Sequence, residues 1–156
     1  FMNCDHSMLF YRFYREPKIV LSLFKERLKT VIVINLLPTI VLALVLAILL
    51  YLSGGTTNPI NYIIIILSII SMSIFFSIHN LVLYYLLQPY NIGMEMKSTT
   101  YTIASIITYW ACYYISKIEV STFIFGIIMI IFVVLYSIIS LILIYYYAPK
   151  TFKLKN

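Results

Sequence analysis

Charged residues are scarce in this chain. Only 10% of its 156 residues are charged, with 5 Asp and Glu against 11 Lys and Arg, whereas about a quarter of the residues in soluble domains are charged. So little charge does not cover a water-soluble surface, which excludes soluble enzymes and soluble nucleic-acid-binding proteins. The chain also has only two cysteines, Cys4 in a basic leader and Cys112 in an apolar run. We therefore expect no disulfide framework.

Motifs for catalysis and nucleotide binding are missing as well. Serine, histidine and acidic residues never cluster as in a hydrolase, and the four glycines form no phosphate-binding loop. The run Cys4-Asp5-His6 has three metal-ligating residue types, but adjacent side chains rarely converge on one ion and no second cluster lies at ligand spacing. We therefore expect no enzymatic activity, no metal and no cofactor in this chain.

The sequence has long apolar runs instead. Hydrophobic residues make up 63% of the chain, and the mean hydropathy is +1.01. A helix needs about 20 apolar residues to cross a hydrocarbon core of about 30 Å. These runs are continuous, whereas the strands of a membrane barrel alternate apolar and polar residues. The sequence predicts an all-α integral membrane fold with four transmembrane helices, at about residues 31–52, 60–87, 99–115 and 121–147.

The third and fourth spans are predicted from one apolar stretch, residues 99–147. A single helix of that length would be about 73 Å long, more than twice the thickness of the hydrocarbon core. The chain must therefore fold back within this stretch. Lys117 and Glu119 are its only charged residues, and they mark the turn.

Residues 1–30 form a leader that is too polar to span a membrane. A helix that begins at Pro17 would place apolar residues on one stripe and polar residues elsewhere. The stripe consists of Val20, Phe24, Leu28 and Val31, and the polar set consists of Lys18, Ser22, Lys25, Glu26 and Lys29. This pattern predicts an amphipathic helix that precedes the first span and lies in the plane of the cytoplasmic interface.

Positive charge predicts the orientation of the chain. Ten of the 11 Lys and Arg residues lie in the leader, in the 88–98 connection or in the basic tail 148–156, and one lies in the 116–120 turn. Cytoplasmic segments of membrane proteins carry the excess of Lys and Arg. We therefore expect both termini in the cytoplasm, and the turns at 53–59 and 116–120 on the outer side.

Four residues inside the predicted spans are candidates for a functional role: Asn35, Pro38, His79 and Asn80. Polar groups at membrane depth are candidates for function in general. His79 and Asn80 either handle a substrate or protons, or form hydrogen bonds between helices. Pro38 bends the first span, either as a gating hinge or as a static kink.

Two stretches resemble a known family, the permeases of bacterial ATP-binding cassette exporters. They are residues 1–38, FMNCDHSMLFYRFYREPKIVLSLFKERLKTVIVINLLP, and residues 79–98, HNLVLYYLLQPYNIGMEMKS, and together they cover about a third of the chain. The resemblance implies that the chain is the C-terminal segment of a longer permease subunit. We expect further spans upstream, which agrees with a chain that begins at Phe1 rather than at methionine.

The resemblance also implies a location and partners. Such a subunit lies in the bacterial cytoplasmic membrane, dimerises, forms part of a translocation pathway and receives a separate cytosolic ATPase, which binds the ATP. Candidate residues for receiving the ATPase lie in the cytoplasmic segments of the two stretches: Glu16, Lys18, Lys25, Glu26, Glu95 and Lys97. The alternative is that these segments are ordinary solvated connections.

A second function from a different class stays open. The chain is then a small non-transporting membrane protein, such as an immunity or assembly factor, that acts through helix–helix contacts. Basic and aromatic residues interleave in the leader, as in proteins that bind single-stranded nucleic acid. Beside a spanning helix this pattern favours anionic lipid, and we expect no nucleic-acid partner.

Overall fold

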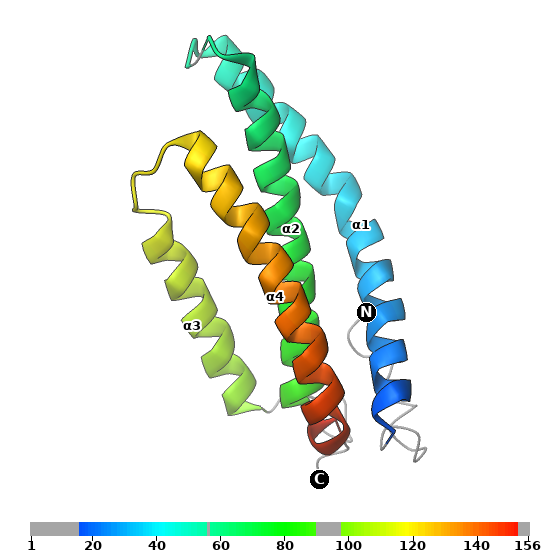
Figure 1. Cartoon of the computed structure of the whole chain (residues 1–156). Coiled ribbons are helices and arrows are strands. Elements are labelled where there is room, and N and C mark those ends of the chain that lie inside the picture. The colour runs from blue at the N-terminus through cyan, green and yellow to red at the C-terminus, as the bar shows by residue number, and fades with distance from the viewer. Residues whose placement is uncertain (1–15, 56, 90–97, 153–156) are drawn as a thin grey trace. The chain divides into compact units, whose positions relative to one another are not determined.

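The computed structural model describes residues 16–55, 57–89 and 98–152, which form four α-helices (Figure 1). They are α1 (Pro17–Leu52), α2 (Pro59–Leu87), α3 (Thr99–Ile115) and α4 (Thr122–Thr151). These described residues contain no strand, so the prediction of an all-α fold is confirmed. Three of the helices, α1, α2 and α4, are long and apolar enough to cross a membrane.

The structure differs from the sequence prediction at the leader. α1 runs without a break from Pro17 to Leu52, so the predicted amphipathic segment and the first span belong to one helix. The reason is that no glycine or proline lies between Pro17 and Pro38 to end the first segment. The polar residues that were expected to lie off the stripe are exposed, and Val20 and Phe24 of the stripe are fully buried. The orientation in the plane of the membrane stays a prediction.

α3 has the bounds that the sequence predicted for the third span. Its 17 residues make a helix of about 26 Å, slightly less than the thickness of a hydrocarbon core. Ser98 caps its start by accepting the N–H of Tyr101, and Ser116 ends it by donating its own N–H to the Cys112 carbonyl. None of its residues is buried. That α3 crosses the membrane stays a prediction.

Glycine, asparagine and proline set the turn between α1 and α2. Gly54 adopts a φ of 66°, in the left-handed region that favours glycine just after a helix end. Asn58 accepts the N–H of Ile60 with its side-chain oxygen at 3.0 Å. Pro59 then occupies the first position of α2, where its missing N–H costs no helical hydrogen bond.

The chain divides into two compact units, and each is described by itself. Unit 1 comprises Phe1–Arg27, His79–Glu119 and Ile139–Asn156, and unit 2 comprises Leu28–Ile78 and Val120–Ile138. Unit 1 thus contains the start of α1, the end of α2, all of α3 and the end of α4. Unit 2 contains the remaining parts of α1, α2 and α4.

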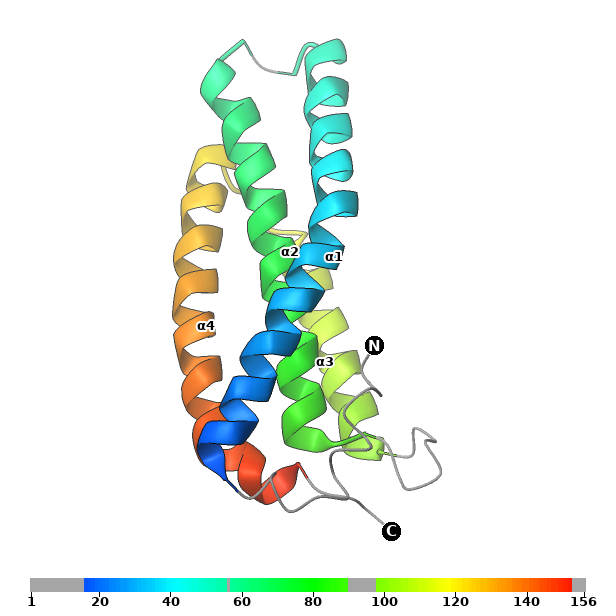
Figure 2. The same cartoon turned by 90° about the vertical axis from the view of Figure 1, so that its right-hand side faces the viewer.

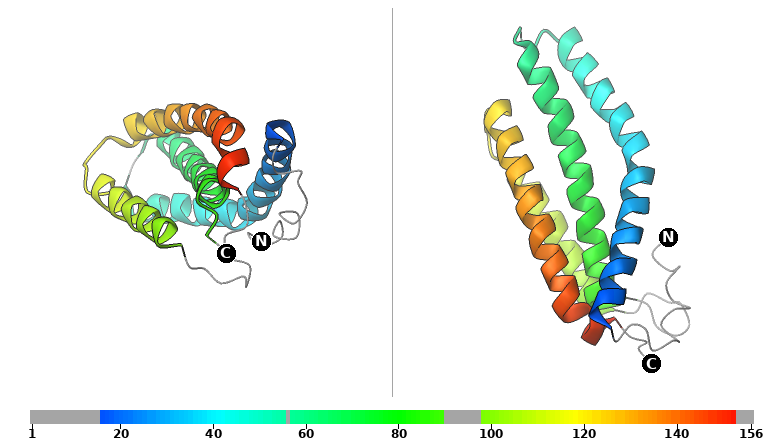
Figure 3. Two further views of the ribbon diagram at one scale, coloured as in Figure 1. Left: turned by 90° about the horizontal axis from the view of Figure 1, so that it is seen from below. Right: turned by 45° about the vertical axis from the view of Figure 1, so that its right-hand side comes forward.

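The core of unit 1 is built on aromatic rings. The ring of Tyr85 stacks on that of Phe152, and Phe24 meets Tyr85 edge-on with 5.5 Å between ring centroids. Phe152 reaches α2 because the last turn of α4, which contains Pro149, bends toward the end of α2 (Figures 2 and 3). The buried residues of this unit are Val20, Phe24, Leu81, Val82, Tyr84, Tyr85, Gln88, Pro89, Ser140, Ile144, Ala148 and Phe152.

The core of unit 2 has mostly small or hydroxyl-bearing residues. Its buried residues are Thr39, Ala43, Ser68, Ser77, Ile78, Gly126 and Val133. A Cβ atom on Gly126 of α4 would lie 2.4 Å from Ile64 Cγ2 and 3.0 Å from Ser68 Oγ of α2, so the two helices approach closely only because glycine has no side chain. Small residues at such contacts are typical of helix packing in membranes, where backbones must come close to gain van der Waals contact.

Candidate functional site

Two pairs of polar side chains join α1 and α2 in unit 2, and we call them the polar ladder: Asn35 with Ser77, and Thr39 with Ser73. Asn35 Nδ2 donates to Ser77 Oγ at 3.0 Å, and the Thr39 hydroxyl is hydrogen-bonded to the Ser73 hydroxyl at 2.7 Å. The two residues on each helix are four positions apart and therefore share a face. The polar ladder holds α1 against α2 over successive turns.

Two hydroxyls of the ladder, those of Thr39 and Ser77, also bond within their own helices. Thr39 donates to the Asn35 carbonyl at 2.6 Å, and Ser77 donates to the Ser73 carbonyl at 2.8 Å. A hydroxyl has one proton, so Ser77 accepts from Asn35 with its remaining lone pairs. The side-chain hydrogen bonds of Asn35 Nδ2 and Ser73 Oγ in the ladder both reach across to the neighbouring helix.

Pro38 lies between the two α1 residues of the ladder. α1 continues through it, and its side chain is exposed. Proline lacks an N–H, so this turn of α1 has one helical hydrogen bond fewer than its neighbours. The contacts of Asn35 and Thr39 with α2 flank this weaker turn. The two interpretations of Pro38, as a gating hinge and as a static kink, both stay predictions.

A similar contact joins α2 and α3 in unit 1. His79 Nε2 lies 2.9 Å from Thr108 Oγ1. The Thr108 hydroxyl also lies 2.9 Å from the Ala104 carbonyl, and the direction of its bond with His79 depends on the tautomer of the imidazole ring. Of the two roles considered for His79, this geometry matches hydrogen bonding between helices. The neighbouring Asn80 is exposed.

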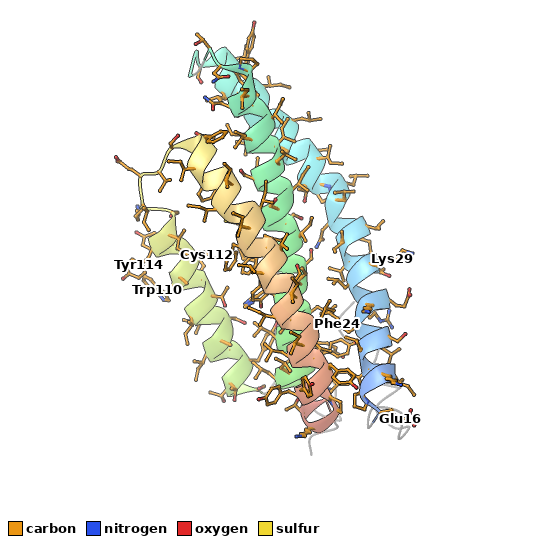
Figure 4. All side chains as sticks on the ribbon, in the orientation of Figure 1. Glu16, Phe24, Lys29, Trp110, Cys112 and Tyr114 are labelled. Atoms are coloured by element: carbon orange, nitrogen blue, oxygen red, sulfur yellow. The ribbon has the colours of Figure 1, made fainter. Side chains whose placement is uncertain are left out.

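The candidate residues for receiving an ATPase are only partly within the described ranges. Glu16, Lys18, Lys25 and Glu26 are all exposed at the start of α1. Phe24, in the same segment (labelled in Figure 4), meets the ring of Tyr85 of α2 edge-on. We call residues 16–27 the first segment of α1. It therefore has an exposed charged side, and its other side is packed against the core of unit 1. Glu95 and Lys97 lie outside the described residues.

Metal-ligating side chains do not gather in residues 16–55, 57–89 and 98–152, where no group of three or more His, Cys, Asp and Glu residues could hold an ion. The run Cys4-Asp5-His6 lies outside these residues. The contacts that the described residues do form include hydrogen bonds between helices and packed aromatic rings.

Sequence reasoning missed several residues of these contacts. Thr39 and Thr108 were not among the candidates, although Thr39 pairs with Ser73 of α2 and Thr108 pairs with His79 of α2. Gln88 was placed in a polar connection, yet it is fully buried with a φ of 40°. The spacing of Ser73 and Ser77 was a usable signal, since small residues four apart permit close helix contact.

Comparison of the chain with protein families, with curated proteins and with solved structures gave no significant match. The permease interpretation therefore depends on the two sequence stretches named above and on the physical arguments that follow.

Proposed function

We propose that the chain is the membrane-spanning subunit of a bacterial ATP-binding cassette exporter and that the first segment of α1 receives a separate ATPase. The observation that carries the proposal is the aromatic cluster of unit 1, which we define as Phe24, Tyr85 and Phe152. Its rings connect the start of α1, the end of α2 and the end of α4. An element that is pushed by a partner must be attached to the helices that it is to move.

The cluster supplies that attachment. Glu16, Lys18, Lys25 and Glu26 present both signs of charge to a cytosolic partner, while Phe24 is 0% exposed against Tyr85. A displacement of the first segment is therefore transmitted to α2 and α4, because packed rings resist separation. The partner binds and hydrolyses the ATP, and two copies of the subunit enclose the pathway in the bacterial cytoplasmic membrane.

A second function is favoured by one observation. Asn80 is exposed on α2, within the apolar sequence of a helix that is long enough to cross a membrane. A carboxamide at membrane depth forms hydrogen bonds with another helix where it can, because it has no water to bind. A non-transporting protein that binds a partner helix, such as an immunity or assembly factor, accounts for this residue without an ATPase.

The test compares partner binding and ATP hydrolysis. The full chain is isolated from its own membranes in lipid nanodiscs, and the co-purified proteins are identified and assayed for ATP hydrolysis. If the chain is an exporter subunit, we expect an ATP-binding cassette ATPase among the co-purified proteins. This ATPase should no longer co-purify when Lys18 and Lys25 are both changed to Glu. Phe24→Ala should keep the subunit bound but lower its hydrolysis, whereas Phe123→Ala, which changes an exposed ring, should alter neither. Retention of a partner that hydrolyses no ATP, and its loss in Asn80→Leu, would favour the second function.

A further inference from the structure

Four aromatic side chains gather at the C-terminal end of α3, and we call them the α3 patch: Tyr109, Trp110, Tyr113 and Tyr114. They are 67%, 49%, 43% and 65% exposed, respectively. The ring of Trp110 lies 5.8 Å from that of Tyr113 and 5.9 Å from that of Tyr114, between centroids. Positions 110, 113 and 114 share a helix face, and Figure 4 shows Trp110 and Tyr114 projecting from the same side of α3.

Two opposite charges follow the patch in the turn after α3. Lys117 and Glu119 are both exposed. The Lys117 ammonium lies 5.1 Å from the centroid of the Tyr113 ring, a distance at which a cation is attracted by an aromatic face. The ammonium is therefore held beside the patch, and a carboxylate lies two residues further along the chain.

We propose that the α3 patch, with Lys117 and Glu119, binds the headgroup of a zwitterionic phospholipid that has a primary amine, such as phosphatidylethanolamine. Lys117 pairs with the lipid phosphate and Glu119 with the lipid ammonium. The rings of the patch lie at the level of the headgroups, where amphipathic tyrosine and tryptophan side chains are enriched because one end is apolar and the other polar.

The charges favour this lipid over an anionic one. The turn carries one positive and one negative side chain, which is the complement of a headgroup that carries one phosphate and one ammonium. A headgroup without an ammonium, such as phosphatidylglycerol, would leave Glu119 unpaired beside a phosphate. The inference does not depend on the exporter proposal, because it uses only α3 and the turn that follows it.

The proposal has a consequence for α3 itself. Headgroup binding at Lys117 fixes the C-terminal end of α3 at one surface of the bilayer. A helix of 17 residues, about 26 Å long, then reaches close to the opposite surface if it is upright, since the hydrocarbon core is about 30 Å thick. The site would thus hold the shortest of the four described helices in a transmembrane position.

Trp110 makes the test direct, because it is the only tryptophan in the chain and its fluorescence reports on this site alone. The full chain is reconstituted in vesicles of phosphatidylcholine with brominated acyl chains, which quench tryptophan on contact. Unbrominated phosphatidylethanolamine, phosphatidylcholine or phosphatidylglycerol is then added in increasing proportion. A lipid that binds at the α3 patch displaces the quencher and restores the fluorescence of Trp110.

We expect phosphatidylethanolamine to restore fluorescence at about a two- to fivefold lower mole fraction than phosphatidylglycerol, the range that an exposed ion pair contributes. Lys117→Gln and Glu119→Gln should each reduce this preference, and Lys150→Gln, which removes an exposed lysine from α4, should not. Bromines near the headgroup end of the acyl chain should quench more strongly than bromines near its tip.

Three results would overturn the proposal. A preference for phosphatidylglycerol, or no preference, would show that the two charges do not select the headgroup. Stronger quenching from the tips of the acyl chains would place Trp110 in the bilayer centre. Absence of quenching in any mixture would show that another protein surface, and not lipid, covers the α3 patch.

Discussion

The rings of Tyr85 and Phe152 stack with 4.5 Å between their centroids and 11° between their planes. The Thr151 hydroxyl adds a contact of 3.4 Å to the Tyr85 carbonyl. The end of α2 and the end of α4 are therefore joined by both a ring stack and a polar contact, although they are far apart in the sequence. Both rings are buried, Tyr85 at 0% and Phe152 at 1% exposure.

Removal of the Phe152 ring should loosen the contact between the end of α4 and the end of α2. Phe152→Ala is expected to lower the free energy of unfolding by about 3 kcal/mol, because it leaves a cavity beside Tyr85. Tyr146→Ala removes a ring that is 64% exposed and should have little effect. Thermal unfolding of the purified chain in detergent, followed by near-ultraviolet circular dichroism, measures both. Equal effects from the two changes would contradict the assigned role of Phe152.

The hydrogen bond between Asn35 and Ser77 of the polar ladder should give a measurable coupling energy between the two residues. In a double-mutant cycle, Asn35→Ala and Ser77→Ala are expected to interact by about 0.6 kcal/mol, and by at most about 1.7 kcal/mol, as hydrogen bonds between membrane helices do. Asn35→Ala combined with Ser68→Ala should be additive, since Ser68 donates to the Ile64 carbonyl and not to α1. Unfolding equilibria in mixed micelles provide the free energies. If the double-mutant cycle of Asn35 and Ser77 gives no coupling energy, the 3.0 Å contact does not contribute to stability.

Two glycines should respond differently to the same change. Gly126→Ala puts a methyl group against the stiff, β-branched Ile64, so we expect a loss of about 1–3 kcal/mol. Gly55→Ala meets Leu50 Cδ1, the end of a flexible side chain, and should be tolerated. Unfolding in detergent compares the variants, and Ile64→Ala should partly restore the stability of the Gly126 variant. A harmless Gly126→Ala would show that α2 and α4 are not in close contact there.

The sequence predicted the helices well because their ends have local causes. Ser98 and Ser116 set α3 through backbone hydrogen bonds within a few residues, and the excess length of residues 99–147 required a turn. Helix pairing was not predictable, since an apolar run does not mark which face contacts protein and which contacts lipid. The stripe with Val20 and Phe24 was expected to face the membrane interface, whereas in the structure both side chains are buried within the chain and Phe24 meets Tyr85 edge-on.

His79 should attach α3 to α2 through its hydrogen bond with Thr108. His79→Leu is expected to raise the rate at which maleimide labels Cys112 of α3, in a chain that carries Cys4→Ser, because the bond to Thr108 is lost. His79→Gln places an amide N–H near the position of Nε2 and should largely preserve the slow rate. The same labelling rate in all three chains would mean that α3 is held by other contacts.

Single cysteines can decide whether α3 crosses the membrane. In a chain without Cys4 and Cys112, cysteines at Thr57, Val120 and Lys150 are labelled with an impermeant reagent on intact cells. Four spans with both termini inside predict labelling at Thr57 and Val120 only. If α3 does not cross, Val120 is protected and Lys150 is labelled. Labelling at Lys150 alone would show that the chain has the opposite orientation in the membrane.

The bonds that hydroxyls make within their own helices have a consequence for the order of assembly. Ser68, Ser77 and Thr108 each donate to the carbonyl four residues earlier, so each hydroxyl proton is already bonded when its helix stands alone in lipid. Such helices can enter the bilayer one at a time, and association then adds hydrogen bonds without breaking any. The Asn35 amide, by contrast, donates to Ser77 of the neighbouring helix. That bond forms only when α1 and α2 meet, in a second stage that follows insertion of the single helices.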